Sequence, residues 1–307
     1  YGMKNVHRSD GICHQLMTEA GYVKPGNIVF GTDSHTTTYG CVGAFSSGIG
    51  YTEMASILGT GTMWIKVPET IKVVIEGELP ANVMSKDIIL RLIGDLGADG
   101  ATYRALEFSG STIENMTVAS RMTMSNMAIE AGAKCALFTP DEKTAEYCEI
   151  ELNDFQKSLV GDEDATYMKT ITYRAEDFVP VMACPSQVDK IRNVSELEGT
   201  EIDQVFIGSC TNGRLEDLKA ADGKKIFAYH LNDCEDLPLG SCGDDKRLWP
   251  GEGVVDHAGI AAALKEIGFD GVCTIEEFRP EYYAMSHEDN VKKAAEVTRD
   301  FVQKYFG

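Results

Sequence analysis

Positive charge is scarce in this chain. Its 307 residues contain 28 Lys and Arg against 48 Asp and Glu, so the formal net charge at pH 7 is −20. Nucleic acids are bound through basic faces that meet their phosphates, and we therefore expect no nucleic-acid partner. An anionic substrate would need cations or a metal placed locally in its pocket.

Long apolar runs are also absent. No stretch approaches the ~20 residues that a transmembrane helix requires, so we expect no membrane span. The opening residues, Tyr1 to Val6, do not follow the signal-peptide pattern of a basic start and an apolar core. The default expectation is a cytoplasmic protein.

Closely spaced cysteines are missing as well. No two of the nine cysteines lie three residues apart, since they stand at positions 13, 41, 135, 148, 184, 210, 234, 242 and 273. Short regular spacings are typical of secreted disulfide frameworks and of thiolate metal sites. The sequence therefore predicts neither a disulfide scaffold nor a Cys-x-x-Cys ligand pair. The glycine-rich stretch 38–50 lacks Gly-Lys-Ser/Thr, which excludes a phosphate-binding loop there.

What the chain does contain is an alternation of strand-like and helix-like patterns, which predicts an α/β fold in layers. The length suggests about two domains of ~150 residues each. In the first part we predict strands at 27–31 and 71–77 and helices at 86–96, opened by Ser85, and at 117–131. Residues 149–200 are acidic and weakly patterned, and we interpret them as a connecting region.

Cys210 lies in the segment Ile207-Gly-Ser-Cys-Thr-Asn-Gly-Arg214. The stretch 204–208 is strand-like, and 215–218 has a helical pattern. A cysteine between them would lie at the end of a strand beside a helix N-terminus, where the helix dipole favours the thiolate that ligates metals. The alternative, a small residue in a turn between strand and helix, is equally compatible with this segment alone.

Three further motifs accompany this segment. They are Gly11-Ile-Cys-His-Gln15, the stretch Pro25–Gly40 that contains Gly-Thr-Asp-Ser-His-Thr-Thr-Thr-Tyr-Gly, and Asn126-Met-Ala-Ile-Glu-Ala-Gly-Ala-Lys134. Together with the Cys210 segment they resemble the aconitase superfamily over residues 1–221. Within it, the chain is most similar to the large subunits of 3-isopropylmalate dehydratase and homoaconitase. The resemblance implies an aconitase-like three-layer α/β core, present in part.

The resemblance also implies an activity, that of a hydro-lyase. Such an enzyme removes water from a 2-hydroxy di- or tricarboxylic acid and adds it back at the neighbouring carbon, with a [4Fe–4S] cluster as Lewis acid. The isopropylmalate branch serves leucine biosynthesis, a part of amino-acid biosynthesis. A separate small subunit would complete the pocket.

Site residues follow from the same resemblance. The acid–histidine pairs that shuttle protons would be His14 with Asp33 and His35 with Glu130, because a carboxylate holds an imidazole in one tautomer and raises its pKa toward the working pH. Asn126 and Glu130 are four residues apart, and so share one face of the predicted helix. The alternative is a solvated polar stripe, but the neighbouring Met and Ala residues favour a buried face. The remaining implied residues are Ser34 and Asn126 for substrate and Cys210 for the cluster.

The sequence departs from the family pattern in several places. The family's cluster is held by three cysteines, one in the Cys210 motif and two in a later Cys-x-x-Cys that is absent here. The later substrate-binding arginines and the catalytic serine have no visible counterpart, and the chain opens inside the family's pattern. We therefore expect no stable cluster on this chain alone, and essentially no dehydratase activity.

The character of the sequence changes near residue 222. Segments 225–233, 248–254 and 267–276 resemble the C-terminal end of a xylose-isomerase-like TIM barrel, of the sugar isomerase/epimerase superfamily. We therefore predict two domains, 1–221 and 222–307. In the second we expect strands 226–230 and 272–276 around a helix 258–267, and a last helix opened by Ser286, which together form a βαβα tail.

A second candidate site lies in this tail. In that superfamily a histidine and a glutamate at strand ends help to bind a divalent metal, and His230 and Glu276 match them by position. Ligands from earlier strands are absent, and two ligands are fewer than the three that a catalytic metal usually needs. The alternatives to a hydro-lyase are therefore a metal-dependent sugar isomerase or epimerase and a non-functional chimeric chain.

Overall fold

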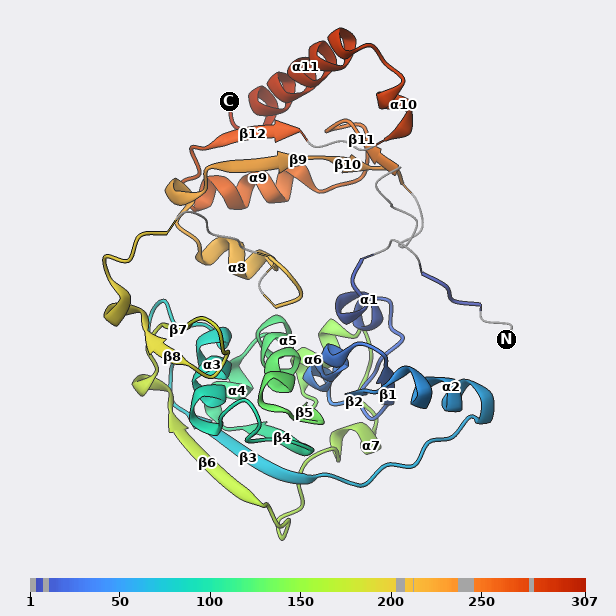
Figure 1. Ribbon diagram of the computed structural model, residues 1–307, viewed down its shortest axis with the longest axis vertical. Helices are drawn as coiled ribbons and strands as arrows, with labels where there is room; N and C mark the ends of the chain where they lie inside the picture. The colour runs from blue at the N-terminus through green and yellow to red at the C-terminus, as the bar shows by residue number, and fades with distance from the viewer. Residues whose placement is uncertain (1–3, 8–10, 203–207, 212, 237–245, 276–278) are drawn as a thin grey trace. The chain divides into compact units, whose positions relative to one another are not determined.

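The computed structural model describes residues 4–7, 11–202, 208–211, 213–236, 246–275 and 279–307 (Figure 1). The chain forms two compact units: a larger unit of residues 13–212, and a smaller unit of residues 1–12 and 213–307. The domain boundary at 221/222 stays a prediction. Both units alternate strands with helices and contain parallel strand pairs, so the expected α/β class is confirmed.

The core of the larger unit is a four-stranded parallel sheet with strand order β5-β4-β3-β6. Its strands are β3 (Glu69–Glu76), β4 (Arg104–Ser109), β5 (Cys135–Phe138) and β6 (Lys169–Arg174). Alternate residues of β3 are buried, as expected for a strand with one face in the core. Parallel strands need helical crossovers to return the chain, and these helices also cover the sheet.

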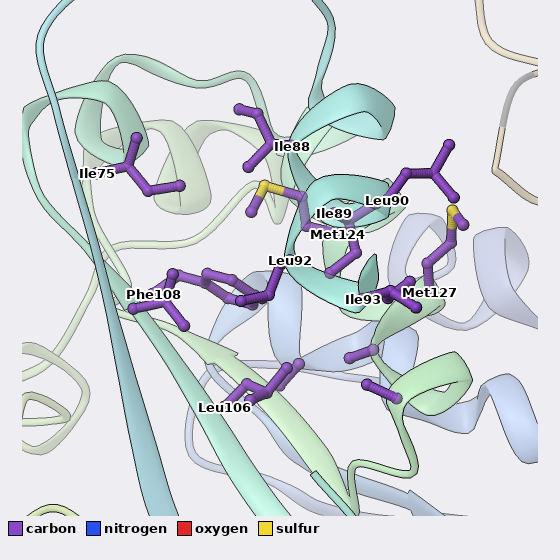
Figure 2. Packing of buried hydrophobic residues seen from close by; sticks show 14 of the residues in the cluster. Ile75, Ile88, Ile89, Leu90, Leu92, Ile93, Leu106, Phe108, Met124 and Met127 are labelled. Carbon is purple, nitrogen blue, oxygen red and sulfur yellow. The ribbon is translucent and has the colours of Figure 1, made fainter. Parts of the chain in front are cut away.

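Helices α3 (Ser85–Leu96) and α5 (Val118–Met127) contribute to the core that lies against this sheet. In Figure 2, the side chains of Ile89, Leu92, Ile93 and Met124 gather beside Phe108 of β4. These five side chains belong to one buried cluster, and each fully buried aliphatic or aromatic side chain stabilises the fold by roughly 1.5–3 kcal/mol. The larger unit is therefore held mainly by this helix–sheet core.

Two helix boundaries differ from the sequence prediction. Ser85 does not cap α3: the helix begins at Ser85 itself, and Asp87 Oδ2 accepts a hydrogen bond of 2.8 Å from the Met84 N–H. The predicted helix 117–131 is an α-helix only as far as Met127. It continues as the 3₁₀ helix η2 (Ala128–Ala131) and ends at Gly132, whose φ of 82° is left-handed.

The interpretation of 149–200 as a connecting region is wrong. This region supplies β6, which pairs in parallel with β3 at the edge of the sheet. Only Ile171 and Tyr173 of β6 pack on the core, so the strand carries a weak apolar signal. The region also forms a hairpin of β7 (Val181–Ala183) and β8 (Ile191–Asn193). Its remaining elements are α7 (Asp154–Lys157), η3 (Ala175–Asp177) and η4 (Val194–Leu197).

A second, two-stranded sheet holds the turn that follows residue 31. Strand β1 (Ile28–Gly31) pairs in parallel with β2 (Phe45–Gly48), and the 3₁₀ helix η1 (Ser34–Val42) joins them. Gly40 of η1 packs so closely on β5 that a Cβ would overlap the Ala136 carbonyl. The other elements of the larger unit are α1 (Cys13–Glu19), α2 (Tyr51–Thr60), α4 (Ser111–Asn115) and α6 (Glu142–Tyr147).

The smaller unit contains the predicted strand–helix–strand arrangement. Strands β9 (Ala228–Leu231) and β12 (Val272–Ile275) pair in parallel, and α9 (His257–Glu266) lies between them in the chain. Ser286 caps the last helix, α11 (His287–Tyr305), by accepting from the Asp289 N–H at 3.1 Å. The remaining elements are α8 (Leu215–Ala220), η5 (Gly223–Lys225), β10 (Asp233–Cys234), β11 (Arg247–Leu248) and α10 (Pro280–Tyr283). Across the described residues, no helix combines the length and the hydrophobicity needed to span a membrane.

Candidate acid–base site

The turn after β1 places three polar side chains at the start of η1. Asp33 is the N-cap of this 3₁₀ helix, and its Oδ1 accepts a hydrogen bond of 2.7 Å from the His35 N–H. This is the geometry for which Asp is favoured at helix starts. The cap fixes Asp33, Ser34 and His35 relative to one another, because all three belong to the same turn of backbone.

The first acid–histidine pair joins α1 to this turn. His14 Nε2 lies 3.1 Å from Asp33 Oδ1, and the His14 side chain is buried whereas that of Asp33 is half-exposed. Burial is the largest influence on His14 and lowers its pKa; Asp33 raises it and His35 lowers it, with a net lowering. Asp33 thus raises the pKa of His14 as expected, but the net shift is a lowering, which the sequence did not predict. Desolvation of the imidazolium outweighs the attraction of the carboxylate.

The second pair joins η1 to η2. His35 Nε2 lies 3.2 Å from Glu130 Oε1, and His35 Nδ1 lies 3.2 Å from Ser34 Oγ. The rings of His14 and His35 are 6.1 Å apart between centroids, so the two pairs form one cluster. Both predicted pairings are confirmed by these distances. The expectation that Glu130 is buried is wrong, because its side chain is 37% exposed.

Asn126 and Cys210 meet on the other side of η1. Asn126 is fully buried, and its Nδ2 donates to Thr38 Oγ1 at 2.8 Å and to Cys210 Sγ at 3.4 Å. The turn that holds Cys210 is tied to α5, because Thr123 Oγ1 donates to the Thr211 carbonyl at 2.8 Å. Of the strand expected at 204–208, residues 204–207 lie outside the described residues. The predicted substrate contact of Asn126 stays a prediction.

Sequence reasoning missed a buried cation on α5. The Arg121 side chain is 1% exposed and forms an ion pair with Asp141, the N-cap of α6. Burial raises the pKa of Asp141, but hydrogen bonds from Arg121 and Thr144 outweigh it and leave that pKa below its ordinary value. An arginine in the middle of an apolar helix pattern is the signal that could have found it, since such a charge needs a partner.

Of the two candidate metal residues of the smaller unit, His230 alone lies in the described part of the chain. His230 is exposed on β9, opposite Thr274 of β12 in the register. Glu276 lies outside the described residues. Within the described ranges, no group of three or more His, Cys, Asp and Glu side chains could hold a metal ion.

The larger unit is thus a parallel α/β unit that carries two adjacent acid–histidine pairs. The sequence pattern of the aconitase family (aconitate hydratase) matches residues 1–198, and the chain belongs to this family. A second pattern, the xylose isomerase-like TIM barrel, matches residues 205–301. The predicted resemblances are thereby confirmed for both parts.

Several curated proteins are similar to the first part. A probable 3-isopropylmalate dehydratase large subunit of Methanosarcina mazei is 49% identical over 220 residues, which cover 71% of this chain and 52% of the relative. A probable methanogen homoaconitase large subunit of the same organism is 49% identical, with 71% and 56% covered. The 3-isopropylmalate dehydratase large subunit of Halothermothrix orenii is 52% identical, with 74% and 55% covered. The chain thus spans about half the length of the curated relatives it matches.

Among solved structures, the chain matches a crystal structure of the IOLI protein with a binding zinc atom. The identity is 23%, the TM-score is 0.29 and 78% of each chain is covered. A TM-score this low supports no conclusion about the arrangement of the whole chain.

Proposed function

We propose that residues 13–212 carry the proton-transfer part of an aconitase-type hydro-lyase site. Its substrate would be a 2-hydroxy di- or tricarboxylic acid, as in 3-isopropylmalate dehydratase and homoaconitase. The observation that carries the proposal is the cluster of His14–Asp33 and His35–Glu130, with the two imidazole rings 6.1 Å apart. Two imidazoles held by separate carboxylates are suited to donating a proton and accepting another.

Burial and the contact with Asp33 together favour one tautomer of His14. Because burial lowers the pKa of His14, its ring is neutral near pH 7, and its Nε2–H donates to Asp33. If His35 likewise donates its Nε2–H to Glu130, its Nδ1 is free to accept from the Ser34 O–H. The atoms that can exchange a proton with a bound acid are therefore the half-exposed Asp33 carboxylate and the Ser34 hydroxyl.

Members of this family bind a [4Fe–4S] cluster, which activates the substrate hydroxyl when bound. The residues of this chain do not fit that group. The sequence has no cysteine pair three residues apart, and Cys210 is the only cysteine with a recorded contact to Asn126 among the described residues. We route no step through the cluster, and we propose that the 307 residues alone hold no stable one.

The decisive experiment uses a chimera. Residues 213–307 are replaced by the corresponding half of a related large subunit, which is expected to supply the missing cysteine pair. The chimera is then reconstituted anaerobically with iron and sulfide and mixed with the relative's small subunit. We expect turnover of 2-isopropylmalate that falls about 100-fold or more in Glu130→Gln, since general acid–base catalysis contributes about 10²–10⁴-fold.

Glu114→Gln is the matched control, because Glu114 is an exposed carboxylate of the same unit, on α4. Its turnover should stay within about twofold of the parent, as is usual for a surface change. A folded, cluster-loaded chimera without turnover, or a Glu130→Gln variant with full turnover, contradicts the proposal. Turnover near one per second by the unmodified chain with a small subunit, within the usual enzyme range, would show that the smaller unit supplies the missing groups.

The second candidate is a metal-dependent sugar isomerase or epimerase in the smaller unit. It is favoured by the match of residues 205–301 to the xylose isomerase-like TIM barrel and by the parallel pairing of β9 with β12. Binding of Mn²⁺ or Zn²⁺ by the full chain, measured by calorimetry and lost in His230→Ala, supports it. Equal binding by that variant rejects it.

A further inference from the structure

Strand β12 of the smaller unit has one edge that no described strand covers. It pairs in parallel with β9 on its other side, and the two strands form a sheet of their own. The Val272 N–H donates to the Phe227 carbonyl at 2.9 Å, toward β9. Because backbone groups point alternately to the two sides of a strand, those of Cys273 and Ile275 point to the free edge. Such an edge is a template for pairing with another chain.

The sequence of β12 does not protect this edge. Natural edge strands are commonly blunted by charged residues, by proline or by a bulge. Strand β12 reads Val-Cys-Thr-Ile, so it contains neither a charged residue nor a proline. Its register with β9 is regular along all 4 residues, so it has no bulge either. The edge is therefore open to a further strand.

The hydroxyl of Thr274 is a polar group without a partner in this strand. Its Oγ1 is shielded from solvent, and among the described residues it forms no hydrogen bond. A buried polar atom without a hydrogen bond destabilises a fold, and native structures contain few of them. Thr274 therefore indicates that a group outside the single chain covers this strand.

An apolar groove of about 760 Å³ lies between β12 and the last helix, α11. Figure 1 shows α11 beside β12. The helix lines the groove with a stripe of residues at helical spacing: Val291, Ala294, Ala295, Thr298 and Val302. Another face of α11 is already covered, since Phe301 is 3% exposed and packs edge-on against His257. The helix thus has two apolar faces, and the stripe in the groove, where Val291 is 68% exposed, is the uncovered one.

We propose that β12 and this stripe of α11 are the contact surface of a homodimer. The two β12 strands pair in antiparallel about a two-fold axis that is perpendicular to the sheet and passes beside Thr274. Cys273 then exchanges backbone hydrogen bonds with the partner's Ile275. Thr274 lies directly opposite the partner's Thr274, at the short distance where two threonine hydroxyls can hydrogen-bond. A two-fold contact is closed, so it gives a dimer and not a filament.

The charges of α11 favour a second copy of the same helix in antiparallel orientation. The helix is acidic in its first turn, at Glu288 and Asp289, and basic toward its end, at Arg299 and Lys304. Arg299 lines the groove and forms no ion pair within the described ranges. The two-fold axis places both α11 helices on one face of the joined sheet. The acidic start of each helix therefore meets the basic end of the other.

The size of the contact sets its strength. Twelve residues line the groove, whereas each side of a standard stable interface has roughly 20–30. We therefore expect a dissociation constant in the micromolar range and a dimer that depends on concentration. A rival occupant is a separate barrel fragment whose strand pairs in parallel with β12, since a closed barrel leaves no edge. The second copy is preferred because it supplies partners for both Thr274 and Arg299.

Sedimentation velocity of the full chain tests the proposal, in a reducing buffer that keeps the cysteines free. We expect monomer at about 1 µM and dimer at about 200 µM, on either side of the expected dissociation constant. Val302→Glu and Val291→Glu each place two carboxylates in the contact, one from each copy. Each should weaken the dimer about 100-fold or more, because apolar burial is lost and like charges meet.

Val254→Glu is the matched control, since Val254 is an exposed valine of the same unit outside the groove. It should keep the dissociation constant within about twofold, as is usual for a surface change. Far-UV circular dichroism equal to that of the parent shows that each variant is folded. Hydrogen exchange tests the strand pairing without a substitution. The amides of Cys273 and Ile275 should exchange more slowly at the high concentration, whereas those of α2 should not change.

Four results overturn the proposal. They are a chain that stays monomeric at about 200 µM, a dimer that both groove variants leave intact, a dimer that Val254→Glu weakens equally, and β12 amides that exchange equally at both concentrations. A monomer that binds a separately produced barrel fragment through β12 falls under the first of them. None of these outcomes involves turnover or iron, so the homodimer stands or falls independently of the proposed hydro-lyase function.

Discussion

Replacing Asp141 by Asn removes the negative charge that pairs with the buried guanidinium of Arg121. The Asn side chain has nearly the same shape as the Asp side chain that it replaces. Arg121 is 1% exposed, and besides Asp141 it donates at 3.4 Å to Thr144 Oγ1 and to the carbonyls of Ile113 and Glu114. The new Asn side chain can still cap α6, where Asp141 Oδ1 accepts from the Thr144 N–H at 3.0 Å. The substitution therefore tests the effect of the negative charge separately from that of the helix cap.

The cost follows from the burial of Arg121. Removing one partner of a buried ion pair destabilises a protein by about 3–5 kcal/mol, because the other charge is left uncompensated. Asp141 itself is 34% exposed, and the carbonyls keep part of the compensation, so we expect a loss at or just below this range, about 2–3 kcal/mol. In a double-mutant cycle with Arg121→Met, the coupling between the two sites should be at least about 1.5 kcal/mol.

The stabilisation that the Arg121–Asp141 ion pair provides depends on pH in a definite direction. The pKa of Asp141 is lowered from its ordinary value of 3.8 in the folded protein. The stabilisation is therefore complete above about pH 5 and is lost as the pH falls through the folded value. The difference between the parent and Asp141→Asn should shrink over that acidic range.

Hydrogen exchange is the suitable assay for this prediction. Amides of β4 and β5 in the core of the larger unit exchange through its global opening, so their protection reports its free energy of unfolding. Asp256→Asn is the matched control, since Asp256 also caps a helix, α9, by accepting from the Gly259 N–H at 2.9 Å. If Asp141→Asn lowers the free energy of unfolding by less than about 0.5 kcal/mol, the size of an ordinary surface change, the prediction is refuted.

The remaining predictions concern the cluster, the packing of η1 and the second acid–histidine pair. The full chain, reconstituted with iron and sulfide, should bind far fewer than four irons per chain by metal analysis, and Cys210→Ala should not alter that amount. A parent chain that binds four irons and loses them in Cys210→Ala would contradict this prediction. Gly40→Ala should cost about 3 kcal/mol or more, because the Cβ meets a backbone carbonyl that cannot move away, as measured by hydrogen exchange in β5. His14→Gln in the chimera should lower turnover about 100-fold or more while leaving cluster absorbance intact, and an unchanged rate would remove His14 from the proton-transfer role.

Much of the fold followed from local patterns in the sequence. Strands β1 and β3 and helix α3 appear where apolar residues recur with the matching period, because one buried face forces that recurrence. Strand β6 was missed because it lies at the edge of the sheet and buries few apolar side chains. Ser85 was misassigned because a serine before an apolar face resembles an N-cap, but here it is itself buried in the first turn.

The pairing of the site residues was predictable, but their electrostatics were not. The resemblance to the aconitase family implied the pairs His14 with Asp33 and His35 with Glu130, and the distances agree. The sign of the pKa shift of His14 depends on how much water the fold excludes from the ring, which no spacing encodes.

The burial of His14 gives the two acid–histidine pairs different roles in the proposed function. Because the charged form of the buried His14 is the costly one, its neutral ring holds Asp33 through the Nε2–H in the proposed function, and the half-exposed Asp33 carboxylate is the group that accepts a proton. His35 is more exposed, and its two ring nitrogens contact Glu130 and Ser34, so in the proposed function a proton can pass along this second pair to the Ser34 hydroxyl. The two pairs of the proposed site therefore have different environments, which is the condition for opposite roles at one pH.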